Sequence, residues 1–252
     1  MRKRRALLLL VPAILVLLTA VGPVAAATAD GTGGTLRDIV TNVFGENTAT
    51  LDIVLLLTIL TLAPSILMML TGFTRIIIVL SFIRNAMGMQ QTPSNQVLIG
   101  LALFLTFFVM RPVITEVYET AYIPYTQEEI SQDELIDTAM GPIRDFMLRQ
   151  TFQSDLRFFI EMSGTEAETL EELPHSTVIS AFITSEIKRA FQIGFFIYIP
   201  FIIIDMVVAS TLMAMGMMML PPAMISLPFK VLLFVMVDGW QLVIKTLITG
   251  FG

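Results

Sequence analysis

Charged side chains lie inside otherwise apolar stretches of this sequence, and they are the residues best placed to do chemistry. They are Arg75, Asp205, Lys230, Asp238 and Lys245. A charge at the depth of a bilayer costs on the order of several kcal/mol unless it is paired or faces water. We therefore expect these side chains to point at partner subunits or into a wet lumen. Asp238 and Lys245 share a helix face but lie about 10 Å apart along its axis, too far for a direct pair.

Methionine is concentrated in one short part of the chain. Of 17 methionines, seven fall in residues 206–224: Met206, Met213, Met215, Met217, Met218, Met219 and Met224. Methionine is flexible and polarizable, so a ring of methionines from several subunits could close a pore and still deform around many polypeptide side chains. The alternative is that they fill gaps in an apolar interior. Three consecutive residues point in different directions, which favours a shaped constriction over one packing face.

This sequence lacks the residues that most enzyme reactions need. The chain has no cysteine and one histidine, His175, which sits beside Pro174 and is typical of a loop histidine. No nucleophile elbow, phosphate loop, HExxH, EF-hand or dinucleotide fingerprint occurs. The acidic run at residues 166–172 lacks the alternating ligands and central glycine of a calcium loop, so it reads as a solvated face. We predict neither an enzyme nor a bound cofactor or metal.

The composition is that of a membrane protein. Hydrophobic residues make up 55% of the chain and charged residues 14%, with a mean hydropathy of +0.81. A soluble domain has a charged fraction of about a quarter. The formal net charge of −6 argues against nucleic-acid binding.

Residues 1–27 have the pattern of a secretory signal peptide. Four basic residues precede an apolar run, then Gly22-Pro23 and small residues, and cleavage after Ala27 fits best. The alternative is an uncleaved first transmembrane helix, but the apolar run is barely long enough to span and contains Pro12. A polar segment, residues 28–50, follows.

The remaining apolar stretches predict two helical hairpins. Residues 51–83 are too long for one untilted span and are interrupted by Pro64, Gly72 and Arg75, so we expect a kinked or broken helix there. A second helix covers residues 97–118. Residues 190–220 and 223–249 form the second hairpin, separated by Pro221-Pro222, which cannot continue a helix. The fold class is therefore an all-α membrane protein with two long, kinked hairpins.

The middle of the chain is water-exposed, because residues 121–172 hold more than half of the acidic residues. Apolar residues at helical spacing predict one amphipathic helix over residues 143–162, ended by Gly164. A cleaved signal places this segment outside the cytoplasm and both hairpin turns inside. The positive-inside rule fits that topology poorly, since Arg111, Lys188 and Arg189 flank the outer segment.

Four blocks of this sequence resemble the FliP family of type III export-gate proteins (FliP/SctR-like). They are residues 74–113 (TRIIIVLSFIRNAMGMQQTPSNQVLIGLALFLTFFVMRPV), 189–210 (RAFQIGFFIYIPFIIIDMVVAS), 215–222 (MGMMMLPP) and 226–242 (SLPFKVLLFVMVDGWQL). The virulence-type homologues share these blocks but usually lack the signal peptide and extended amino terminus, which favours the flagellar branch.

The resemblance implies a core subunit of the flagellar protein-export gate in the basal body of the bacterial inner membrane. It implies a homo-oligomer, a pentamer, that joins FliQ and FliR in a helical cone, beside FlhA and FlhB, and conducts unfolded flagellar polypeptides. The domains are then the signal peptide (residues 1–27), a periplasmic segment (28–50), the first hairpin (51–118), the acidic extracytoplasmic segment (119–187) and the second hairpin with the methionine loop (188–252). The gasket falls on Met217, Met218 and Met219, and charges at subunit contacts or the lumen on Lys188, Arg189, Asp205, Lys230 and Asp238.

Two other functions stay open at this stage. A proton-coupled transporter could use Asp205, Lys230 and Asp238 as a relay, although the halves of the chain show no matching repeat. A structural anchor could nucleate the basal body without conducting anything. Trp240, close to Asp238, fits either an interfacial anchor or a subunit contact.

Overall fold

The computed structural model describes residues 50–89, 91–164, 169–217 and 219–251. The chain divides into two parts, Met1–Thr61 and Leu62–Gly252, and the packing below is that of the second. Every regular element in the described residues is a helix, which confirms the all-α fold class. The predicted signal peptide and cleavage at Ala27 lie outside the described residues, as does the polar segment up to residue 49.

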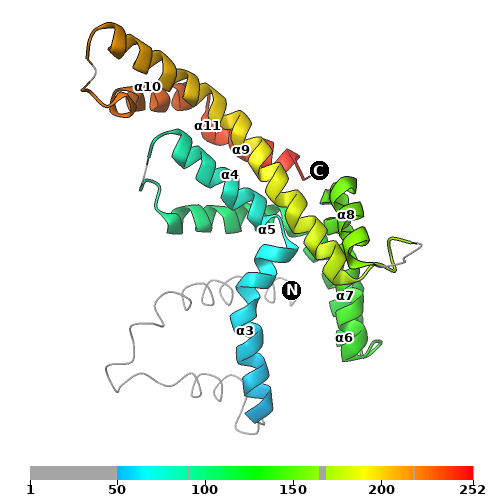
Figure 1. Cartoon of the computed structure of the whole chain (residues 1–252). Coiled ribbons are helices and arrows are strands. Elements are labelled where there is room, and N and C mark those ends of the chain that lie inside the picture. Colours follow the sequence, from blue (N-terminus) through cyan, green and yellow to red (C-terminus); the bar gives the residue numbers. More distant parts are fainter. Residues whose placement is uncertain (1–49, 90, 165–168, 218, 252) are drawn as a thin grey trace, which may run out of the picture. The chain divides into compact units, whose positions relative to one another are not determined.

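The first apolar stretch is a broken helix, as the sequence predicts. Helix α3 (Thr50–Leu70) ends before Gly72, and α4 (Phe73–Ala86) leaves at 76° to the last turns of α3. Pro64 lies inside α3 without ending it. Helix α5 (Asn95–Val117) then packs against α4 to complete the first hairpin, seen in Figure 1.

The acidic middle contains more helices than predicted. Helix α5 continues through a π-helix, η1 (Tyr118–Tyr122), into α6 (Ile123–Thr126), and α7 (Gln132–Gln150) and α8 (Gln153–Ser163) follow. The single helix expected over residues 143–162 is wrong. Phe152 is extended, and its backbone N–H donates to the Ser185 hydroxyl at 3.0 Å instead of continuing the helix. Gly164 ends α8 in the left-handed conformation, as predicted.

The second hairpin is built on α9 (His175–Ala214), which has 40 residues and a length of about 60 Å. It returns through α10 (Pro222–Met236) and α11 (Gly239–Thr249), bent by 62° from each other. The sequence predicts that Pro221-Pro222 ends the first helix of this hairpin, and this is wrong. Helix α9 ends earlier, because the turn begins at Gly216. Pro222 instead occupies the first position of α10, where a missing N–H costs nothing. The break between α10 and α11 was not predicted.

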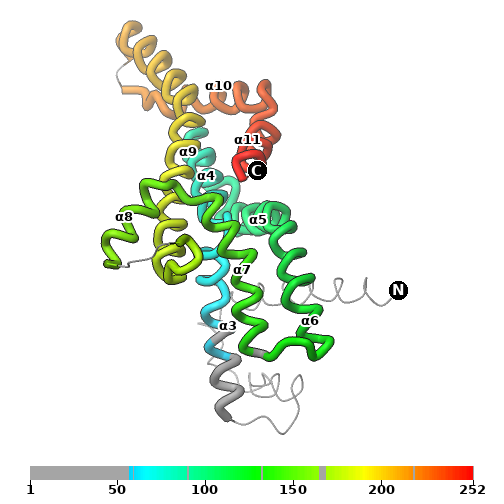
Figure 2. The backbone as a smooth tube through the Cα atoms, turned by 90° about the vertical axis from the view of Figure 1, so that its right-hand side faces the viewer, coloured from blue at the N-terminus to red at the C-terminus, as the bar shows by residue number. Residues whose placement is uncertain are grey.

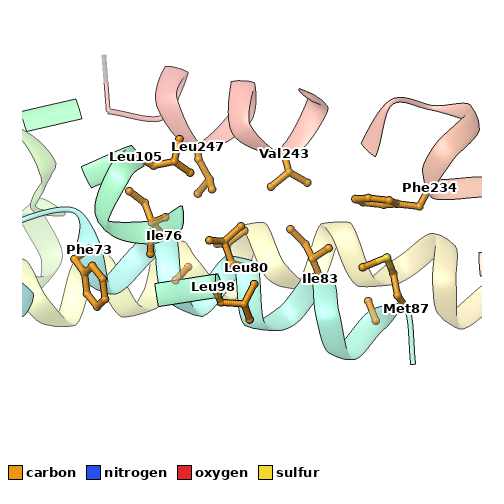
Figure 3. Close-up of a cluster of buried hydrophobic side chains, with 14 of the residues drawn as sticks. Phe73, Ile76, Leu80, Ile83, Met87, Leu98, Leu105, Phe234, Val243 and Leu247 are labelled. Atoms are coloured by element: carbon orange, nitrogen blue, oxygen red, sulfur yellow. The ribbon is translucent and has the colours of Figure 1, made fainter. Parts of the chain in front are cut away.

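Helix α9 is the element against which the others pack. Helices α4, α7, α8 and α10 all contact it, and Figures 1 and 2 show them distributed along its length. The larger apolar cluster joins α4, α5, α9, α10 and α11. In Figure 3, Val243 and Leu247 of α11 face Leu80 and Leu105 across this cluster. A second cluster lies among α5, α7 and α9 around Met147 and Phe182.

The described helices leave much apolar surface uncovered. Two are long and apolar enough to cross a membrane, residues 95–126 and α9, and up to four spans are possible if each bent pair counts as one. Phe104, Phe196 and Met236 are among the large apolar side chains that remain exposed. This surface must be covered by lipid or by other subunits.

The close approach of α4 and α9 depends on a small residue. A Cβ atom at Gly194 would lie 2.6 Å from Cγ of Phe82, and the ring base has little freedom to withdraw. We expect Gly194→Ala to destabilise the fold by about 1–3 kcal/mol. The measurement is thermal unfolding in detergent, followed by the fluorescence of Trp240, the chain's single tryptophan.

Gly100→Ala is the matched control, because it also lies inside an apolar helix and a Cβ there meets no atom within 4 Å. It should leave the melting temperature unchanged or raise it slightly. An equal loss of melting temperature in both variants would show that any glycine-to-alanine change in an apolar helix has this cost, and that the α4–α9 contact is not its cause.

Candidate functional site

The methionine-rich turn is held by its backbone. Gly216 has φ +73°, its N–H donates to the carbonyl of Met213 at 3.0 Å, and the N–H of Met217 donates to that of Leu212 at 3.0 Å. This pair of bonds is a Schellman motif, which ends α9 and turns the chain away from its axis. Both Met217 and Met219 are exposed, Met219 at 98% of its surface. Met218 lies outside the described residues.

An apolar groove lies beside this turn, between α9 and α10. It has a volume of about 460 Å³. Its lining is apolar apart from one hydroxyl, that of Thr211: Ile203, Ile204, Val207, Val208, Thr211, Leu212, Met215, Ile225 and Phe229. The hydroxyl of Thr211 donates to the Val207 carbonyl in its own helix, so it offers no free donor to a ligand. The groove can therefore accept only apolar groups.

An ion pair fastens α9 to α10 near the groove. Lys230 Nζ lies 2.6 Å from Asp205 Oδ2, and the Ser226 hydroxyl donates to Asp205 Oδ1 at 2.5 Å. Lys230 is 5% exposed, whereas the Asp205 side chain is 39% exposed. The carboxylate thus satisfies a buried ammonium while keeping contact with the surface. The pair sets the spacing of the two helices that carry the methionine turn.

A second polar contact ties α8 to α9. Asp155 is buried and accepts hydrogen bonds from Lys188 Nζ and, at 2.9 Å, from the Ser185 hydroxyl. Burial alone would raise the pKa of Asp155, but these hydrogen bonds and the lysine charge outweigh it and hold that pKa below its usual value. The guanidinium of Arg189 stacks on the Phe152 ring at 4.4 Å from its centroid.

The structure corrects the expectation for Arg75. It is fully buried and pairs within the chain, with Glu186 of α9 and Gln150 of α7, instead of pointing at a partner subunit or a lumen. Sequence reasoning missed both partners. Glu186 could have been noticed as an acidic residue just before the apolar part of α9, but nothing local connects it to Arg75.

The other singled-out residues lie apart from these contacts. Asp238 is exposed at the start of α11 with φ +49°, and Lys245 is exposed on α11. Trp240 is partly exposed and meets Phe234 edge-on at 5.4 Å. His175 begins α9 with its Nδ1 3.2 Å from Arg144 Nη1. That Lys188, Arg189, Asp205, Lys230 and Asp238 meet other subunits or a lumen stays a prediction.

The described residues offer no built metal centre. Among them, no group of three or more histidine, aspartate or glutamate side chains comes together in a way that could hold an ion. The site is therefore an apolar turn and groove braced by ion pairs.

The Asp205–Lys230 pair generates a stability prediction. Asp205→Asn should lower the free energy of unfolding by about 1–3 kcal/mol, because it leaves the buried ammonium without a counter-charge. Adding Lys230→Met should recover part of the loss, since no charge then remains to be satisfied. Thermal unfolding of the two single variants and the double variant tests this. Additive losses in the double variant would contradict a direct pair.

The lowered pKa of Asp155 generates a pH prediction. Its stabilising contribution is fully present above the unfolded pKa of about 3.9 and is lost as pH falls through the lower folded value. Asp155→Asn should therefore lower the melting temperature at pH 7, and the gap to the unsubstituted protein should shrink below about pH 4. Asp145→Asn, at an exposed position of α7, is the control. A gap independent of pH would show that the carboxylate charge is not responsible.

Comparison with known proteins identifies the family of this chain. The sequence model of the FliP family matches residues 56–247. The flagellar biosynthetic protein FliP of Pectobacterium carotovorum is 55% identical over 205 residues, 81% of this chain and 80% of that protein. FliP of Bacillus subtilis is 54% identical over 81% of this chain and 92% of that protein. FliP of Aquifex aeolicus is 45% identical over 82% of this chain and 88% of that protein. The matched region contains every described helix from α4 to α10, the methionine turn and the ion pairs, so this chain belongs to the FliP family.

Proposed function

We propose that this protein is a core subunit of the flagellar type III export gate, a conduit for unfolded flagellar polypeptides across the bacterial inner membrane. The observation that carries the proposal is the exposed methionine turn, fixed by backbone bonds at the end of two apolar helices. Its relatives are named as flagellar biosynthetic proteins, which supports a role in building that organelle.

The turn suits a seal better than a packing filler. A buried filler would be covered by its own chain, whereas Met215, Met217 and Met219 all face outward. Thioether side chains change rotamer easily and contact many surfaces favourably. Copies of Met217, Met218 and Met219 from several subunits form a gasket that shuts the pore at rest and deforms around a passing polypeptide.

Other subunits complete the gate. The uncovered apolar surface on α5, α9 and α10 is far greater than a soluble monomer tolerates. We infer that a homo-oligomer, a pentamer, together with FliQ and FliR, covers it, with FlhA and FlhB as neighbours in the apparatus. Lys188, Arg189, Asp205 and Asp238 lie at subunit contacts or the lumen, with the buried Lys230 reaching such a contact only through its partner Asp205. The acidic segment with α7 and α8 faces the periplasm.

The gate breaks no bond. Its described grooves are lined mainly by apolar side chains, and the chain carries no nucleotide-binding motif. The energy for transport comes from other components of the apparatus, through an ATPase or the proton gradient. This chain supplies the passage and the closure.

The transporter alternative gains nothing from the geometry. A proton relay needs groups within hydrogen-bonding reach of one another. Asp205 and Lys230 pair with each other, whereas Asp238 is exposed at the α10–α11 break and is not among the ion pairs of the described chain. The structural anchor differs from the gate in one measurable property, the permeability of the membrane.

Replacing Met217, Met218 and Met219 together by alanine should leave assembly intact and make the membrane permeable to small ions. Alanine removes the flexible side chains that meet across the closed pore but keeps the turn, because Gly216 and its backbone bonds are untouched. Ion leak is measured in cells or vesicles containing the gate, with assembly checked by native mass spectrometry.

The matched control replaces three other exposed methionines, Met206, Met224 and Met236, by alanine. It removes the same number of thioethers outside the turn and should cause no leak. Intact assembly without leak in the turn variant would support the anchor and refute the gasket.

A further inference from the structure

Arg75, at the start of α4, donates hydrogen bonds to four oxygen atoms, which belong to three groups in three other parts of the fold. Its Nε and Nη2 donate to the two carboxylate oxygens of Glu186, the former at 3.0 Å. Nη2 also donates to Gln150 Oε1 at 3.0 Å. Nη1 donates to the carbonyl of Gly250, just after α11, at 2.8 Å. The guanidinium therefore joins α4, α7, α9 and the end of α11 at one point.

The segment after α11 is held at this point in two further ways. Gln150 Nε2 donates to the carbonyl of Phe251 at 3.0 Å. The Phe251 ring covers the Arg75 guanidinium at 3.8 Å and stacks on Phe146 at 6.3 Å. Gly72 makes room for the ring, since a Cβ there would lie 2.5 Å from Phe251 Cζ. Phe251 packs against both apolar clusters.

The other end of α11 is a break in the chain. Between α10 and α11 the axis turns by 62°, and Asp238 takes a left-handed backbone conformation at φ +49°. Along α11, Val243 and Leu247 are buried against α4 and α5, as Figure 3 shows, while Gln241, Leu242 and Lys245 are exposed. Helix α11 is thus attached by one apolar face and by its latched end.

We propose that α11 with Gly250 and Phe251 is a detachable strap, hinged at Asp238 and latched by Arg75 and Gln150. The charge balance makes detachment possible. When the strap leaves, Arg75 keeps its two bonds to Glu186, so no charge is stranded, and the two released carbonyls can bond to water. Opening uncovers the start of α4 and lets α11 swing away from α5. This inference rests on contacts within the chain and does not depend on the proposed function.

Hydrogen exchange followed by mass spectrometry on the full chain in detergent tests the strap. In Phe251→Ala, amides of α11 should exchange about tenfold faster or more, because the strap opens locally without global unfolding and a helix of only 11 residues frays once it leaves its packing. Amides of α4 and α9 should stay within about twofold of the unsubstituted protein. Leu242→Ala, on the exposed face of α11, is the matched control and should change neither set.

Two outcomes would overturn the proposal. Unchanged exchange in α11 would mean that Phe251 does not latch it, and equal acceleration in α4, α9 and α11 would mean that α11 belongs to one cooperative core. If Phe251→Ala prevents folding, Phe251→Leu gives the same comparison, because leucine keeps apolar contact but removes the ring from the guanidinium. It should accelerate α11 alone, by a smaller factor.

Discussion

The fold depends on a charge that has been taken out of water, the guanidinium of Arg75. A fully buried arginine is tolerable only when its donors are satisfied and its charge is balanced, and here Glu186 balances it across the α4–α9 contact. The two helices can come close enough for this because Gly194 has no side chain to hold Phe82 away. Once α4 is fixed on α9, α5 follows through its hairpin and α7 through Gln150. Such a pair adds little net stability, because the cost of taking both charges out of water offsets much of their attraction.

The sequence predicts the parts of this fold that depend on local chemistry. Long apolar stretches indicated membrane helices, and Gly72 and Gly164 marked real helix ends. What it could not predict depends on distant residues. The break at Phe152 exists because Ser185 offers its N–H a partner, and Arg75 is satisfied by Glu186, 111 positions away. Aspartate does not mark a helix break strongly, so the left-handed Asp238 was missed. The end of the first helix in the second hairpin was predicted at Pro221-Pro222, whereas α9 ends at the turn that contains Gly216.

In the candidate site, too, some features could be predicted from the local sequence and others depend on distant residues. The sequence alone identified the methionines and the charges Asp205 and Lys230 as unusual, and only the family resemblance pointed to Lys188. Each of these three charges has a specific partner in the structure. The partner Ser226 and the buried Asp155 carried no signal, since a serine or an aspartate is ordinary in any sequence. The apolar groove beside the turn depends on how α9 and α10 are spaced, which only the folded chain determines.

The Schellman motif at Gly216 fixes the path of the methionine turn without any contribution from the methionine side chains. Backbone bonds from Gly216 and Met217 fix where the chain goes, and no methionine side chain is needed for them. These side chains can therefore change in bulk, polarity or oxidation state while the backbone bonds of the turn stay in place. Methionine oxidation, which converts a thioether into a polar sulfoxide, would wet this surface without unfolding the turn. The side chains displayed at the turn can therefore be exchanged without altering the fold that carries them.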